Sequence, residues 1–138
     1  MERIEFCKIL QECRKKSGCK MKDICFALNV IPTAVYRLEK GKNSFNVSTA
    51  LKFLEAIKYI MVVYSNNGTY LIRTYEDAIK YIKDARAGKY TQRELAELIG
   101  YSHITIANIE TMKCIAGIDT FLKIADVLGY TIKIVDKQ

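Results

Sequence analysis

The stretch that decides the fold is YTQRELAELIGYSHITIANIE, residues 90–110. Within each half of this stretch, apolar residues recur every three or four positions, which is the spacing of an amphipathic helix. These positions are Leu95, Ala96, Ile99, Ile106 and Ile109. Gly100 separates the halves, and glycine readily adopts the left-handed conformation that ends a helix. The pattern therefore predicts a helix-turn-helix, two short helices joined by a tight glycine-containing turn.

Both predicted helices begin at residues that suit a helix N-terminus. Thr91 is followed three residues later by Glu94, which is the pattern of a capping box. Ser102 can cap the second helix, which we expect to run to about Glu110.

This stretch resembles the DNA-binding domain of phage-repressor proteins, the Xre-like or lambda-repressor-like family. The family pattern is Gln, two residues, Leu-Ala, three residues, Gly, one residue, Ser, and then Ile and Glu at the end. The matching residues are Gln92, Leu95, Ala96, Gly100, Ser102, Ile106, Ile109 and Glu110. The resemblance implies a DNA-binding transcriptional regulator from a bacterium or its phage. The alternative is a pair of packing helices in an unrelated α-helical domain.

A divergent copy of the same unit precedes this stretch. From Met21 onward the chain aligns with itself without a gap when it is shifted so that Glu39 meets Glu110 and Lys42 meets Lys113. We call this shift the repeat offset. Such fixed-period similarity indicates duplicated units. We therefore predict a first, divergent helix-turn-helix repeat at 1–65, a hairpin linker at 66–74 and a second, family-like repeat at 75–138.

Three further segments are rich in β-branched and aromatic residues or alternate polar with apolar ones. Segments 59–64 and 69–73 flank an Asn-Gly pair, which is a strong signal for a β-hairpin. Segment 130–135 alternates as a strand with one wet face does. A lone hairpin is marginal in water, so we expect the three segments to share one antiparallel sheet. The predicted fold is mainly α, with two tandem lambda-repressor-like units joined by the hairpin. The remaining helices are expected at 2–16, 21–28, 32–40, 47–57, 75–87 and 118–128.

The chain is basic, with 22 Lys and Arg against 15 Asp and Glu and a net charge of +7. Residues 1–69 carry 12 basic and 6 acidic side chains, so most of this charge lies in the first half. A basic surface favours polyanions because binding releases their counterions. Solubility alone is the simpler explanation, and the charge does not decide between the two.

Composition argues against several other classes of protein. No apolar run is long enough to span a bilayer and the N-terminus lacks a signal segment, so we expect a cytoplasmic protein without a membrane partner. Cys7, Cys13, Cys19 and Cys25 recur every six residues, which is not a zinc spacing, and we expect reduced, buried thiols with no metal or cofactor. A metal or redox site is the alternative, and redox sensing by the cysteines stays open. His103 is the only histidine, and no catalytic constellation accompanies it. An enzyme is therefore not expected.

The family resemblance assigns contacts to the second unit. In this family the second helix of the motif lies in the major groove, with its N-terminal residues at base edges. The resemblance thus places Gln92 at a phosphate. It places Ser102, His103, Ile104, Thr105 and Asn108 in the groove, with Lys113 nearby. Asparagine can form two hydrogen bonds with adenine, and Ile104 could contact a thymine methyl group.

The first unit departs from the family pattern, because Met21, Asn29 and Ile31 replace the Gln, Gly and Ser. Its corresponding DNA-binding candidates are Thr33, Arg37, Lys22 and Lys42. Two alternatives stay open for this unit. It binds DNA mainly through charge, or it has lost DNA reading and serves as a packing partner.

The resemblance also implies a structural ion pair in each unit, between Arg14 and Glu39 and between Arg86 and Glu110. The forked arginine side chain suits a partly buried carboxylate, since it can bond both oxygens. We expect double-stranded DNA as the partner of a monomer with an internal pseudo-two-fold axis or of a homodimer. The alternative function is an antitoxin-like module that covers a toxin or another protein.

Overall fold

The computed structural model describes residues 1–137, and this range contains eight α-helices and three β-strands. The predicted mainly α fold with a small antiparallel sheet is confirmed. The helices are α1 (Arg3–Ser17), α2 (Met21–Leu28), α3 (Pro32–Lys40), α4 (Val47–Ile57), α5 (Tyr75–Ala87), α6 (Gln92–Ile99), α7 (His103–Glu110) and α8 (Ile118–Leu128). The strands are β1 (Tyr59–Ser65), β2 (Gly68–Ile72) and β3 (Thr131–Asp136).

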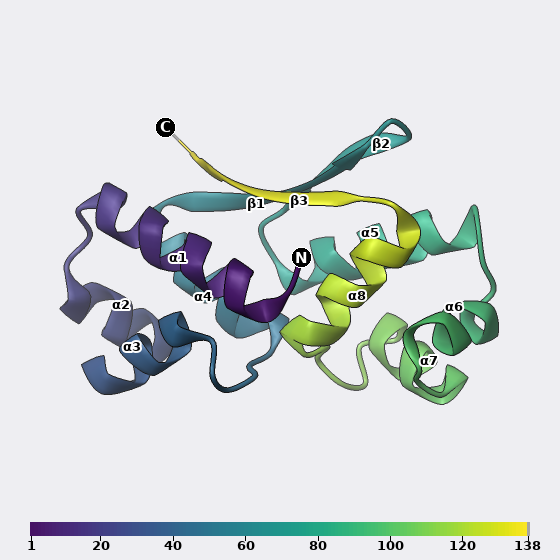
Figure 1. The fold of residues 1–138 in the computed structure, drawn as a ribbon, viewed down its shortest axis with the longest axis horizontal. Helices are drawn as coiled ribbons and strands as arrows, with labels where there is room; N and C mark the ends of the chain where they lie inside the picture. The colour runs from purple at the N-terminus through teal and green to yellow at the C-terminus, as the bar shows by residue number, and fades with distance from the viewer. Residues whose placement is uncertain (138) are drawn as a thin grey trace.

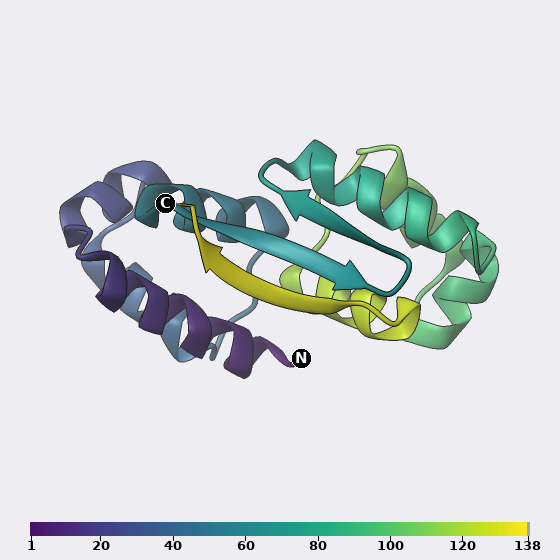
Figure 2. The same ribbon diagram turned by 90° about the horizontal axis from the view of Figure 1, so that it is seen from above.

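The helices form two groups beneath one sheet (Figure 1). The first helix group is α1–α4 and the second is α5–α8. The pairs α2–α3 and α6–α7 lie at opposite ends of the molecule, while α4 and α8 contact each other near the middle. Seen from above, the sheet crosses the boundary between the two groups (Figure 2). The sheet therefore ties together two helical groups that point away from it in the same direction.

The ends of the helices follow the local sequence. Thr91 accepts a hydrogen bond from the Glu94 N–H, and the Glu94 side chain accepts one from the Thr91 N–H, which completes the predicted capping box. Ser102 accepts from the Thr105 N–H at the start of α7. Gly100 ends α6 with a φ of 78°, in the left-handed region that glycine adopts without strain. Asn29 takes the same conformation at the end of α2, with a φ of 56°.

The sheet has the strand order β2-β1-β3, and both pairings are antiparallel. On the face toward the helices, Met61, Val63 and Ile132 are buried in the main core. The predicted third strand is confirmed with its bounds shifted by one residue, because β3 runs from Thr131 to Asp136 and not from 130 to 135. The Tyr130 N–H still donates to the Ala125 carbonyl as part of the C-terminus of α8, so Tyr130 does not pair in the sheet.

Two contacts across the middle of the molecule join residues that are separated by the repeat offset. In the sheet, Val62 of β1 is directly opposite Lys133 of β3. In the loops before α4 and α8, Asn46 forms an isolated antiparallel bridge with Gly117. Each pair joins a residue to its own counterpart in the other group, as residues on a two-fold axis would be joined.

Two hydrogen bonds beside this bridge are reciprocal. The Val47 N–H donates to the Ala116 carbonyl at 2.9 Å. The Ile118 N–H donates to the Phe45 carbonyl at 2.7 Å. The two donors are counterparts under the repeat offset and so are the two acceptors, which means that each group gives and receives the same bond.

The first residues of the chain add contacts whose partners are not separated by the repeat offset. The Met1 ammonium group bonds both carboxylate oxygens of Asp126 at 3.0 and 3.1 Å. Arg3 donates to Asp119 at 2.5 Å and to the Gly41 carbonyl at 3.0 Å. The bonds to Asp126 and Asp119 join the start of the chain and of α1 to α8 of the other group.

The core includes an aromatic cluster beneath the sheet, formed by Tyr70, Tyr81, Phe121 and Tyr130. The Tyr81 hydroxyl is buried there without a hydrogen-bond partner among the described residues. Burial raises the pKa of this phenol far above its ordinary value.

The cysteines, all within the described range, are free thiols. Cys7 and Cys13 are buried as small apolar residues are, and burial raises the pKa of Cys7 to about 11.

Candidate nucleic-acid interface

The helices α6 and α7 pack through their apolar stripes and leave the start of α7 in solvent. Leu95, Ile99, Ile106 and Ile109 are buried between or beneath the two helices. On the first turn of α7 and just before it, Ser102, His103 and Ile104 are exposed. Ile104 keeps 59% of its surface accessible.

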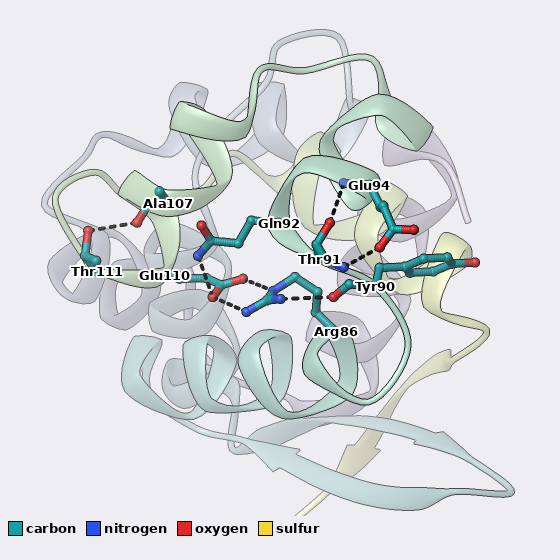
Figure 3. A network of polar contacts seen from close by, with 8 residues as sticks. All are labelled: Arg86, Tyr90, Thr91, Gln92, Glu94, Ala107, Glu110 and Thr111. Atoms are coloured by element: carbon teal, nitrogen blue, oxygen red, sulfur yellow. Dashed lines mark hydrogen bonds and ion pairs between the residues drawn. The ribbon is translucent and has the colours of Figure 1, made fainter.

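A buried ion pair holds the end of α7 against α5 (Figure 3). Arg86 donates from Nε to Glu110 Oε2 at 2.5 Å and from Nη2 to Oε1 at 3.0 Å. Its third group, Nη1, donates to the Tyr90 carbonyl at 3.0 Å. The Glu110 side chain is only 3% exposed. The orientation of α7 is therefore fixed at its C-terminal end, while its N-terminal end projects.

Gln92, which the resemblance places at a phosphate, takes part in this network. Its amide Nε2 donates to Glu110 Oε1 at 3.1 Å, and the side chain is half-buried. An amide nitrogen carries two hydrogens, so one remains for a second acceptor. The bond to Glu110 fixes where that hydrogen points.

The other candidate residues of α7 differ in their freedom to contact DNA. Ser102 and Thr105 form a hydroxyl–hydroxyl hydrogen bond of 3.1 Å, so the cap already uses part of their capacity. Asn108 is half-buried, one turn after Ile104 and on the same side of the helix. Lys113 is exposed just beyond α7, where its backbone N–H donates to the Asn108 carbonyl at 2.9 Å.

The C-terminus of α7 is also closed by a local side-chain bond. The Thr111 hydroxyl donates to the Ala107 carbonyl at 2.8 Å (Figure 3). Among the candidates of the second group, Ser102, His103 and Ile104 come together as the exposed tip of the helix pair. Asn108 and Lys113 lie farther along the same helix and the loop that follows.

The first helix group contains the corresponding ion pair. Arg14 on α1 donates from Nε to Glu39 Oε2 and from Nη2 to Oε1, the latter at 3.0 Å. Hydrogen bonding to Glu39 raises the pKa of the Arg14 guanidinium. The Glu39 side chain is completely buried. Met21 stands where Gln92 stands in the second group, and it has no donor to offer this carboxylate.

The DNA-binding candidates of the first group are all exposed: Lys22, Thr33, Arg37 and Lys42. Lys22 lies on α2 and Thr33 and Arg37 lie on α3, and these two helices are at the opposite end of the molecule from α7 (Figure 1). Lys42 lies in the loop that follows α3. Neither α2 nor α3 has a side-chain cap at its N-terminus. The sequence interpretation also missed Phe26 on α2, which is 89% exposed. Its spacing was a usable signal, because Phe26 lies about 200° around the helix from Ile24, away from the buried stripe.

The described residues give no sign of a metal centre or a membrane span. No group of three or more His, Cys, Asp or Glu side chains within 1–137 could hold a metal ion. In the same range, no helix combines the length and the apolar character that crossing a bilayer requires.

Comparison with known proteins places the match on the second helix group. The model of the Helix-turn-helix family, which covers Xre-like and lambda-repressor-like domains, matches residues 82–135. This range runs from within α5 to β3 and includes the whole of α6, α7 and α8. No curated protein and no solved structure gave a significant match. The family match supports a DNA-binding transcription regulator in general, with DNA as its partner.

Proposed function

We propose that the chain is a sequence-specific transcriptional regulator that binds double-stranded DNA as an intramolecular pseudo-dimer. The two helix groups act as tandem helix-turn-helix units, and α3 and α7 face successive major grooves. The observation that carries this proposal is the pairing of counterpart residues between the two groups, in the sheet at Val62–Lys133 and in the loops at Asn46–Gly117.

Base reading is assigned to α7. His103 and Ile104 project from its first turn, and Asn108 follows one turn later. Asparagine pairs with adenine through two hydrogen bonds, and an apolar side chain contacts the thymine methyl group. Gln92 and Lys113 contact phosphates on either side and fix the register of the helix in the groove.

The first helix group contributes mainly charge. Thr33 and Arg37 face the groove on α3, while Lys22 and Lys42 neutralise phosphates. Arg37 can read guanine with two hydrogen bonds. The two half-sites are therefore unequal, and the target sequence is an imperfect palindrome.

The decisive experiment is selection from a pool of random duplexes with the full chain. We expect enrichment of one site with two unequal half-sites, whose centres lie about one helical turn, or roughly 34 Å, apart. The half-site read by α7 should be the more constrained one. Sedimentation of the complex should give one chain per duplex.

Three results would reject the proposal. An enriched site with a single half-site would exclude reading by two units. Two chains on each duplex would replace the pseudo-dimer by an ordinary dimer. An unenriched pool, with binding that does not weaken as salt rises, would favour the antitoxin-like alternative, because DNA binding releases about 0.9 counterion per phosphate contact.

A further inference from the structure

The corner formed by the end of α2 and the turn into α3 exposes large apolar side chains. Phe26 is 89% exposed, Ile31 68% and Val30 38%. Ala34 follows Ile31 by three residues on α3 and so extends the same face. We call these four residues the α2–α3 apolar surface.

The second helix group provides an internal comparison. Under the repeat offset, Glu97 stands for Phe26, Tyr101 for Val30 and Ser102 for Ile31. Ser102 caps α7 through its hydroxyl, whereas Ile31 offers α3 no such bond. At this corner, the first helix group therefore has apolar side chains where the second has a charged residue and a helix cap. These apolar side chains cannot hydrogen-bond to phosphate, so the difference is not an adaptation to the DNA backbone.

A small pocket continues this surface along α3. It has a volume of about 210 Å³ and is lined by Ala34, Arg37, Leu38, Asn43, Ser44 and Phe45. Ala34 belongs to both the pocket and the apolar surface. The pocket has room for one apolar side chain, and the Arg37 guanidinium at its wall can bond a carboxylate.

The charges around the surface select the partner. Lys22 precedes Phe26 by one turn on α2, and Arg37 and Lys40 follow on α3, while Asp23 is the one exposed acid of these two helices. Three exposed large apolar side chains bury at most about 400 Å², well below the roughly 800 Å² per partner of a stable interface, so the surface suits a short segment rather than a whole folded partner. A second copy would also oppose like charges. An acidic partner gains both the apolar contact and the ion pairs.

We propose that the α2–α3 apolar surface docks an acidic protein segment, which places one apolar side chain in the Arg37 pocket. Because Lys22 and Arg37 are also assigned to DNA under the proposed function, the segment competes with DNA for the first helix group. Docking itself does not depend on that function. The consequence is a regulator that an acidic protein detaches from one half of its site.

The test uses a synthetic amphipathic helical peptide of about four turns, with leucines on one face and glutamates on the other. A matched peptide carries lysine in place of every glutamate. Fluorescence anisotropy measures binding to the full chain, to Phe26→Ser and to the control Leu98→Ser. Leu98 is a matched site because it is 55% exposed on α6. Thermal melting checks that each variant folds.

We expect the acidic peptide to bind, the lysine peptide to bind about tenfold more weakly, and Phe26→Ser to weaken the acidic peptide about tenfold. Leu98→Ser should change little, and the acidic peptide should displace a labelled random duplex. Equal binding of the two peptides, or an unchanged affinity in Phe26→Ser, would overturn the proposal. So would a dimer of the full chain that Phe26→Ser dissociates, since the surface would then join two copies. None of the peptide measurements uses the selected DNA site, so a failed selection leaves the docking result intact.

Discussion

Replacing Arg14 or Arg86 by alanine removes the same guanidinium group from the two helix groups, yet the two changes are expected to differ in cost. Each leaves a buried carboxylate behind, because the Glu39 side chain is 0% exposed and that of Glu110 3%. Removing one partner of a buried ion pair typically costs about 3–5 kcal/mol. We expect this full cost for Arg14→Ala, since Met21 cannot donate to Glu39 in its place.

Glu110 keeps one donor when Arg86 is lost. Gln92 Nε2 still bonds its Oε1 at 3.1 Å, and a hydrogen bond to a charged group contributes about 1.5–3 kcal/mol. Subtracting this contribution gives about 2 kcal/mol for Arg86→Ala. Arg14 also lies 5.8 Å from the centroid of the Tyr36 ring, but such exposed contacts add only about 0.5 kcal/mol.

Urea unfolding followed by circular dichroism measures both free energies. The control is Gln92→Met in the Arg86→Ala background, which removes the remaining donor to Glu110 and places methionine where the first group has Met21. This second substitution should raise the cost to that of Arg14→Ala. The reasoning is refuted if Arg86→Ala costs as much as Arg14→Ala, or if Gln92→Met adds nothing.

Three further predictions concern base reading, pH dependence and the aromatic cluster. Binding titrations should show that Asn108→Ala loses about 1–3 kcal/mol of binding free energy on the selected site and relaxes the preference at one base pair. Lys42→Ala should instead weaken binding to all duplexes alike and lower the slope of log affinity against log salt by about one. Equal loss on random DNA would show that Asn108 does not read bases. Hydrogen bonding to the Thr91 backbone lowers the pKa of Glu94. The stability that Glu94 contributes is therefore fully present above its unfolded pKa of about 4.3 and is lost as the pH falls through the folded pKa. Urea titrations at several pH values should show this loss in the wild type, and Glu94→Gln should reduce it. Tyr81→Phe should raise the free energy of unfolding by about 1 kcal/mol, because it removes a buried hydroxyl that lacks a partner; a lower midpoint in urea would mean that the hydroxyl is satisfied.

Local patterns made much of the fold predictable. Gly100 and the periodic apolar residues around it define α6 and α7 with little dependence on the rest of the chain. The Asn66-Asn67-Gly68 turn defines the hairpin in the same way. The third strand was also predictable by elimination. A lone hairpin needs a further strand to be stable, and segment 130–135 had no other predicted strand to pair with.

Contacts between distant side chains were not predictable at this level. The pattern assigned Gln92 to a phosphate, and nothing in its spacing shows that its amide also bonds Glu110 at 3.1 Å. The Arg3–Asp119 contact joins residues far apart in the chain, and many arginines and carboxylates could pair equally well in sequence. For Phe26, the sequence spacing alone predicts that the side chain lies off the buried stripe of α2. That it is 89% exposed is known only from the structure.

The pairing of β1 with β3 within one chain has a consequence for dosage. A regulator that dimerises through such a sheet must first assemble, so its active form falls with the square of the cellular concentration when copies are few. Here the two halves are covalently joined, and linked modules meet at effective concentrations of order millimolar. Dilution at cell division leaves that pairing unchanged. Under the proposed function, occupancy of the DNA site follows the first power of the copy number, and the response to falling expression is graded rather than switch-like.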